Sequence, residues 1–195
     1  PVKVEIIETR TVGPTLGQDS KDKSQFAFVV GLGAVVLFMI FFYHLSGFIA
    51  DVALMAYTVM LLGILYLMDA TLTLPGVAGI ILSIGMAVDA NVLIFEHFKE
   101  EYQVNRKSLR LAMDAGFKRA FTTIFDSNVT TLIAAGVLFF LGTGTIRGFA
   151  ITLGVGTILS MFTAITLTQY LLKLMINSKL SENPSLYGAN GFMLG

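Results

Sequence analysis

The sequence predicts an all-α integral membrane protein, a bundle of five transmembrane helices with one cytoplasmic amphipathic helix. Hydrophobic residues make up 55% of the 195 residues and charged residues only 13%, with a mean hydropathy of +0.78. This composition is too apolar for a soluble domain of this length. The long apolar runs lack the alternation of membrane barrel strands, so helices are the only structure that satisfies their backbone hydrogen bonds in lipid.

The composition also excludes several classes of protein. Thirteen Lys and Arg balance thirteen Asp and Glu, so no basic excess points to nucleic acid as a partner. The chain contains no cysteine, which excludes disulfides and thiol chemistry. We expect no catalytic residue, no metal and no other cofactor.

Residues 1–23 are expected to be the end of an extracytoplasmic region that leads into the membrane. The stretch VKVEII alternates apolar and charged residues, as a half-buried strand does. The chain starts at Pro1 without an initiator Met or a signal sequence, so we expect a further segment before it.

Two apolar stretches predict the first two transmembrane helices. Residues 24–43 carry no charged group, and a run of about 20 residues matches a hydrocarbon core of about 30 Å. A short link at 44–50 follows. Residues 52–68, flanked by Asp51 and Asp69, predict the second span.

The third predicted span, residues 76–95, begins after a turn that suits a helix start. Thr73 is a candidate N-cap, and Pro75 fits the first helical turn. Asp89 is the only charged residue of this span.

The fourth and fifth spans are predicted at 122–141 and 149–172, and residues 173–195 form a tail. Asp126 is the only charge of the fourth span, and the fifth has none. The loop at 97–121 and the tail lie on the side of the membrane with more Lys and Arg. By the positive-inside rule this side, and the C-terminus with it, is cytoplasmic.

One helical face within the cytoplasmic loop is apolar. The positions i, i+3, i+4, i+7, i+8 and i+11 of this face are Leu109, Ala112, Met113, Gly116, Phe117 and Ala120. The pattern predicts an amphipathic helix at the membrane surface or against the ends of the spans.

Residues 24–172 together are predicted to form one five-helix transmembrane domain.

Two carboxylates lie inside predicted spans at similar depth. At 1.5 Å per residue, Asp89 falls about 4 to 5 Å, and Asp126 roughly 8 Å, to the cytoplasmic side of the midpoint of its span. A charge near the bilayer centre costs about 2.5 to 3.5 kcal/mol, so such residues usually face a protein interior or a watery cavity. The alternative for each is a protonated side chain that hydrogen-bonds a neighbouring helix.

Polar and small residues accompany these two acids. The hydrogen-bonding side chains that follow them are Asn91, Asn128, Thr130 and Thr131. Small residues at four-residue spacing, which let helix backbones approach closely, are Gly79, Ser83 and Ala87 in the third span and Gly148, Thr152, Gly156 and Ser160 at the fifth.

Four strings carry a family resemblance. They are ETRTVGPTLG, LPGVAGIILSIGMAVDANVLIFE, AFTTIFDSNVTTLIAAGVLFFLGTG and RGFAITLGVG. They resemble the C-terminal membrane half of the SecD branch of the SecD/SecF protein-export family, within the resistance-nodulation-division superfamily. The resemblance covers nearly the whole chain. Thr145 departs from it, since the family commonly has Pro at this position.

The resemblance implies a first helix and a large extracytoplasmic domain before Pro1, and a bundle that is half of a pseudo-symmetric resistance-nodulation-division-type assembly. It implies a proton-coupled motor subunit of the Sec pathway rather than an enzyme, in the bacterial plasma (inner) membrane. The implied partners are a SecF-like subunit, the SecY channel complex, exported unfolded polypeptide and membrane lipid. The proton is the implied coupling ion.

The residues and the resemblance together suggest roles. Asp89 is the predicted main proton carrier, with Asp126 as a second relay or structural support. Glu96 is a candidate proton exit or a solvated helix end. Arg147, at the outer end of the fifth span, is a candidate interfacial anchor.

Two other functions remain open from the sequence. A proton-coupled efflux pump or lipid exporter of the same superfamily would use the same carboxylates. Two intramembrane Asp residues on consecutive helices also occur in intramembrane aspartyl proteases, although the flanking residues here differ from the motifs of those enzymes.

Overall fold

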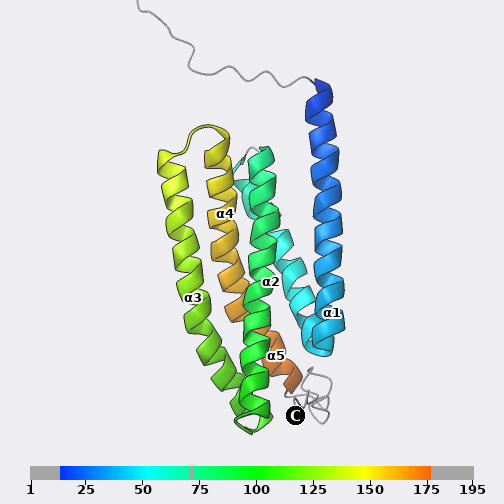
Figure 1. The fold of residues 1–195 in the computed structure, drawn as a ribbon, viewed down its shortest axis with the longest axis vertical. Helices are drawn as coiled ribbons and strands as arrows, with labels where there is room; N and C mark the ends of the chain where they lie inside the picture. Colours follow the sequence, from blue (N-terminus) through cyan, green and yellow to red (C-terminus); the bar gives the residue numbers. More distant parts are fainter. Residues whose placement is uncertain (1–13, 71–72, 177–195) are drawn as a thin grey trace, which may run out of the picture.

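The protein is a bundle of helices (Figure 1), and the computed structural model describes residues 14–70 and 73–176. Its elements are α1 (Pro14–Leu67), α2 (Leu74–Gln103), α3 (Leu109–Leu141), α4 (Thr145–Phe162), the π-helix η1 (Thr163–Thr168) and α5 (Gln169–Ile176). The described residues contain no strand. Four helical stretches are long and apolar enough to cross a membrane: Asp22–Leu67, Leu74–Gln103, Leu109–Leu141 and Thr145–Met175. The prediction of an all-α membrane protein is therefore confirmed.

Two expectations fall on other parts of the chain. The strand expected within residues 1–23 lies in 1–13, outside the described residues, and most of the expected tail lies in 177–195, also outside them.

Helix α1 reverses its direction at His44. This residue has φ 51° and ψ −118°, a conformation that residues other than glycine rarely adopt. The two arms then run back along each other (Figure 1). Gly47 permits the tight turn, because a methyl group there would collide with the backbone carbonyl of Met39. The expected link at 44–50 is therefore almost entirely helical, with the break confined to His44.

Helix α2 begins where the sequence predicts but ends later. The hydroxyl of Thr73 accepts a hydrogen bond of 3.2 Å from the Gly76 backbone N–H, and Pro75 lies in the first turn. No Gly or Pro follows Gly85 until the helix ends at Gln103, so the helix continues through its charged end. The connection to α3 is then only residues 104–108.

The amphipathic segment is not a separate helix. It forms the start of α3, continuous with the fourth predicted span, because no proline interrupts the chain between Leu109 and Leu141. Its apolar face is buried against α2 rather than spread on a membrane surface. Gly116 allows this contact, since a methyl group there would lie 2.7 Å from the Phe98 backbone nitrogen.

The stripes of small residues bring α2 and α4 together. A methyl group at Gly156 would lie 2.5 Å from Cβ of Ser83, and one at Gly79 would collide with the Thr152 hydroxyl. The hydroxyl of Tyr57, on the returning arm of α1, donates a hydrogen bond of 3.3 Å to the Gly156 carbonyl. Helix α2 is thus held between α1, α3 and α4.

The fifth predicted span contains a feature that the sequence does not announce. Between α4 and α5 the chain follows six residues of π-helix, η1, and its Thr163, Ala164 and Thr168 side chains are buried. Such turns are rare and occur frequently at functional sites.

Candidate functional site

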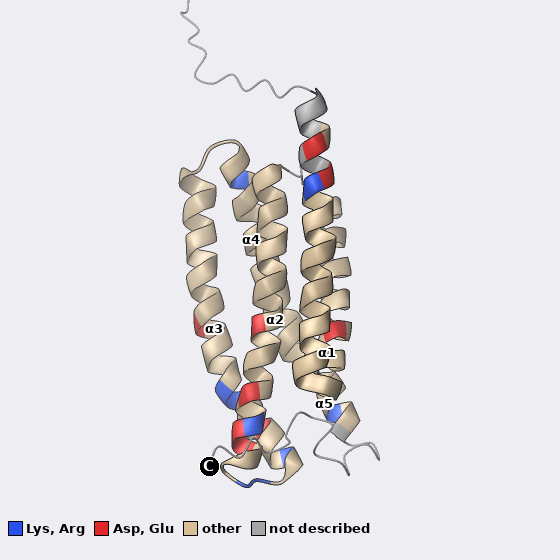
Figure 2. Cartoon of the chain, turned by 45° about the vertical axis from the view of Figure 1, so that its right-hand side comes forward, with Lys and Arg blue, Asp and Glu red and all other residues tan. Residues whose placement is uncertain are grey.

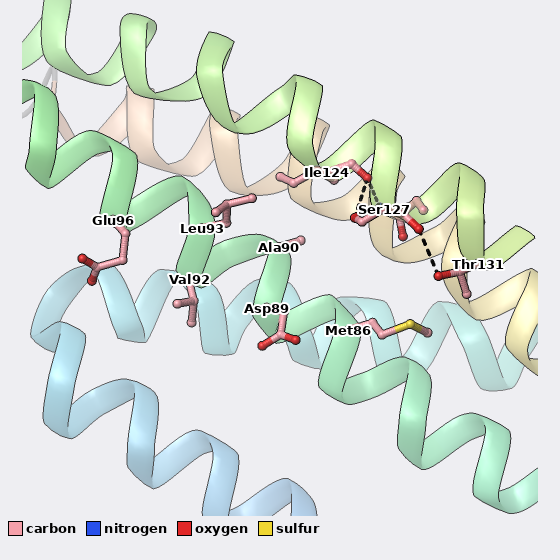
Figure 3. A pocket seen from close by; sticks show the side chains of 10 residues that line it. Met86, Asp89, Ala90, Val92, Leu93, Glu96, Ile124, Ser127 and Thr131 are labelled. Atoms are coloured by element: carbon pink, nitrogen blue, oxygen red, sulfur yellow. Dashed lines mark hydrogen bonds between the residues drawn. The ribbon is translucent and has the colours of Figure 1, made fainter.

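A cleft of about 470 Å³ opens between α2 and α3, inside the apolar part of the bundle (Figure 3). Its lining from α2 is Met86, Asp89, Ala90, Val92, Leu93 and Glu96, and its lining from α3 is Ile124, Ser127, Asn128 and Thr131. Most of this lining is apolar, so the few polar groups determine what the cleft binds.

Asp89 places a carboxylate in this cleft. The residue is exposed, and Figure 3 shows its carboxyl group projecting from α2. It makes no hydrogen bond or ion pair with the residues that the structure describes. The Asp89 carboxylate is therefore accessible to a group from outside the described residues.

Polar side chains of α3 line the opposite wall. The Asn128 amide donates to the Ile124 carbonyl at 2.7 Å, and the Thr131 hydroxyl donates to the Ser127 carbonyl at 3.0 Å. Both side chains are held by the backbone of their own helix. They are supports of the cleft wall and do not bond directly to Asp89.

Asp126 and Thr130 lie outside this cleft. Both are exposed, and Thr130 donates to the backbone carbonyl of Asp126 at 3.0 Å. The contact of Gly116 with Phe98 sets the register of the two antiparallel helices. Asp126 lies ten residues after Gly116 on α3, and Val88 lies ten residues before Phe98 on α2, so Asp126 is level with Val88. Asp126 thus has the depth of Asp89 but not its surroundings.

Asn91 faces away from Asp89. Its amide oxygen accepts a hydrogen bond of 2.8 Å from the hydroxyl of Thr168 in η1, and both side chains are buried. Residues two apart on a helix project about 200° apart, so a helical wheel already separates Asn91 from Asp89. Asn91 joins α2 to η1 and does not support the carboxylate.

Glu96 lines the end of the cleft nearest the turn between α2 and α3 and has two partners. It accepts hydrogen bonds from the Tyr43 hydroxyl at 2.9 Å and from the Lys99 ammonium at 3.1 Å. The Lys99 nitrogen also lies 4.3 Å from the centre of the Tyr43 ring. These contacts connect α1 to α2 beside the turn at His44, so Glu96 has a structural role whether or not it exchanges protons.

Arg147 lies far from the acids. Its Nε donates to the Gly142 carbonyl at 2.9 Å, in the turn between α3 and α4. The neighbouring Gly148 packs on Thr73 at the start of α2. Asp89 lies 16 residues after Thr73 along α2, a distance of about 24 Å at 1.5 Å per residue.

Charged residues gather at the ends of the bundle, with only acidic residues further inside on α1, α2 and α3 (Figure 2). At the turn between α2 and α3, the buried carboxylate of Glu101 bonds to Lys107 at 2.6 Å and to Arg119 at 3.0 Å. Among the described residues, no three His, Asp or Glu side chains are grouped as a metal site.

Asp51 is the residue that sequence reasoning missed. It appeared as a flank of the second span, but it is buried, at 6% exposure, and neither carboxyl oxygen has a hydrogen-bond partner among the described residues. The absence of a helix breaker between residues 48 and 62 was a signal that Asp51 lies inside the helix.

Comparisons with known proteins agree on one family. A family model described as protein export membrane protein SecD/SecF, C-terminal, matches residues 1–178. The protein translocase subunit SecD of Acidaminococcus fermentans is 62% identical over 98% of this chain and 46% of its own length. That of Dictyoglomus turgidum is 56% identical over 91% of this chain and 44% of its own length. The chain therefore spans about half the length of these curated relatives.

Solved structures show the same fold. The crystal structure of SecDF, a translocon-associated membrane protein from Thermus thermophilus, matches with a TM-score of 0.82 and 39% identity. The match covers 86% of this chain and 23% of that one. A second structure, of SecDF in a super-membrane-facing form, matches with a TM-score of 0.78 and 40% identity over 84% of this chain and 22% of its own. The chain therefore belongs to the SecD/SecF family of protein export membrane proteins, as a C-terminal SecD membrane region.

Proposed function

We propose that this chain is the membrane half of a SecD subunit that uses the proton gradient to promote translocation of exported, unfolded protein across the bacterial plasma membrane. The export part is supported by relatives named protein translocase subunit SecD, one of them 62% identical to this chain over 98% of its residues. The proton part is carried by one observation. Asp89 lines an open cleft within an apolar bundle and bonds to no described residue.

Asp89 carries the coupling proton in this proposal. Its carboxyl group takes up a proton while the cleft communicates with one side of the membrane and releases it when access changes to the other. One proton that moves through 100 mV supplies about 2.3 kcal/mol. Since about 1.4 kcal/mol is a tenfold change in an equilibrium constant, this shifts a conformational equilibrium more than tenfold. Asp126, at the same level but outside the cleft, is the second relay or a support.

The bundle crosses the membrane five times in this proposal. The two arms of α1, joined at His44, are the first two spans, and α2, α3 and the α4–η1–α5 stretch are the other three. The turn at 104–108 and the C-terminus then lie in the cytoplasm. The cluster of Lys107 and Arg119 around Glu101 lies at that end.

A SecF-like subunit completes the site. No cation of the described residues pairs with Asp89, and a carboxylate at bilayer depth needs a proton or a positive partner. We infer that the partner subunit supplies a basic side chain to the cleft during part of the cycle, across a pseudo-symmetric interface. The SecY channel complex and the exported polypeptide are the further partners of the whole protein.

The arrangement does not favour an aspartyl protease. That chemistry needs two carboxylates that share one site, about 3 Å apart. The cleft lining includes Asp89 but not Asp126.

The export role is tested by complementation. Full-length protein with Asp89→Asn, which keeps the size of the side chain but cannot titrate, should fail to restore export of a reporter in cells that lack their own SecD. Asp114→Asn is the matched control, because Asp114 is an exposed carboxylate of α3 near Lys173, at 3.8 Å. We expect it to restore export fully. Equal rescue by both variants would exclude the role of Asp89, and no rescue by the unmodified chain would exclude the export function.

A further inference from the structure

A third carboxyl group lies inside the bundle, apart from the cleft. Asp51 is 6% exposed, and neither of its oxygens has a hydrogen-bond partner among the described residues. The hydroxyl of Ser46, on the same arm of α1, is also buried and without a partner there. Buried polar groups are nearly always paired. Two unpaired groups on one short segment therefore need a physical explanation, such as water or a proton on the carboxyl group.

The register of the helices places Asp51 at the height of the start of the π-helical segment. The hydroxyl of Tyr57 bonds to the Gly156 carbonyl at 3.3 Å, and these helices are antiparallel. Asp51 lies six residues before Tyr57 on α1. Phe162, which directly precedes η1, lies six residues after Gly156. Helix α1 packs against η1. Asp51 thus lies about 9 Å from Tyr57 along the axis, level with the start of η1.

The same register puts Asp51 at the depth of Asp89. Gly156 packs on Ser83 of α2, and six residues beyond Ser83 is Asp89. Figure 2 agrees, with acidic residues at one level on α1, α2 and α3. The two carboxyl groups differ in their surroundings, since Asp89 is exposed in the cleft and Asp51 is enclosed.

The ionisable groups of the neighbouring elements do not neutralise Asp51. In α2, beyond Asp89, they are Glu96, His97, Lys99, Glu100, Glu101 and Tyr102, all in its last eight residues. In α4 the one such group is Arg147, at the opposite end, and η1 has none. In α5 they are Tyr170, which is exposed, and Lys173, which lies near Asp114. On α1 itself Tyr43 bonds to Glu96, and His44, at the turn, is exposed. An enclosed carboxyl group without a cation is stable only as the neutral acid.

We propose that Asp51 is a second proton-binding site of this bundle, protonated while α1 packs against η1 and deprotonated when the two separate. On separation the O–H bond of the acid breaks, the proton passes to water that enters beside η1, and the carboxylate is left solvated. Only the link between this proton and export rests on the proposed function.

Infrared spectroscopy of the full-length protein in liposomes tests the site. At neutral pH we expect a protonated-carboxyl band that disappears in Asp51→Asn. In Asp51→Glu the band should shift but remain, and in Asp89→Asn it should be unchanged. An unaltered band in Asp51→Asn would show that Asp51 is ionised and overturn the proposal. If the Asn variant fails to insert, the shift in Asp51→Glu makes the same assignment, and the lack of a shift overturns it.

Turnover distinguishes a proton-exchanging site from a permanently neutral one. With the partner subunits, a translocating substrate and a proton gradient present, the Asp51 band should lose intensity. If the intensity of the Asp51 band is constant during turnover, Asp51 does not exchange its proton and has a structural role only, which overturns the proposal. If export proves independent of the gradient, Asp89→Asn will leave export unchanged, whereas the Asp51 band in the resting protein will still be seen. The two proposals therefore fail separately.

Discussion

Thr168 of the π-helical segment donates a hydrogen bond of 2.8 Å to Asn91 of α2, and both side chains are buried. Asn91 follows the proposed proton carrier, Asp89, by two residues. A movement of α2 on protonation would thus reach η1 through a specific polar contact. The same π-helix η1 also packs against α1, the helix that carries Asp51.

Thr168→Val tests the strength of this contact, because it keeps the shape of the side chain and removes the donor. We expect a loss of about 0.6 kcal/mol in the free energy of unfolding, with an upper value of about 1.7 kcal/mol, as found for hydrogen bonds between membrane helices. Detergent-induced unfolding of the full-length protein measures it. Thr166→Val is the matched control, since Thr166 belongs to the same segment but is exposed. An equal loss in both variants would show that the Asn91 bond contributes nothing specific.

Gly156→Ala tests the close approach of α2 and α4. The added methyl group would lie 2.5 Å from Cβ of Ser83 and 3.0 Å from the Tyr57 hydroxyl. Overpacking of this kind should lower the free energy of unfolding by about 1 to 3 kcal/mol. The larger side chain of Gly156→Leu should push the helices apart, which is measured as a loss of cysteine cross-linking between them. Gly136→Ala is the control, because no atom lies within 4 Å of its methyl position. Alanine favours the helix there by about 0.8 to 1 kcal/mol over glycine. The free energy of unfolding should therefore fall in Gly156→Ala and rise in Gly136→Ala. A stable Gly156→Ala protein would contradict this packing.

Cysteine labelling tests the five spans and their orientation. The chain has no cysteine of its own, so single cysteines can be placed at exposed turn residues of a full-length protein otherwise free of them. A membrane-impermeant reagent should label His44→Cys and Ser108→Cys from the cytoplasmic side only. It should label Met68→Cys and Thr143→Cys from the opposite side only. Labelling of His44→Cys and Met68→Cys from one side would mean that the second arm of α1 does not span the membrane.

The helical bundle could be predicted from apolar run length, but the helix ends could not. A run of about 20 apolar residues specifies a span because backbone groups in lipid must bond internally. Glu and Lys residues, such as Glu96, Lys99 and Glu100, are good helix formers too, so α2 continues past the point where its hydrophobicity stops. For the same reason the amphipathic segment joins α3. The N-terminus of α2 was predictable because Thr73 and Pro75 are specific start signals.

The site was predictable in part. Asp89 could be found because a carboxylate in an apolar span is rare. Its neighbours depend on rotation about the helix axis, which separates Asn91 from Asp89 and places Thr130 on the side of Asp126. The π-helical turn has no sequence signature here. Asp51 was missed because its burial depends on where the chain reverses, at His44 rather than at the end of a seven-residue link.

The central claim is that Asp89 couples the proton gradient to export. Its most direct test is the translocation rate in vesicles that contain the full-length protein, its partner subunit and the channel complex, with and without an imposed gradient. In the Asp89→Asn protein we expect the rate without a gradient to be unchanged and the stimulation by the gradient to be lost. Normal stimulation in the Asp89→Asn protein would contradict the account.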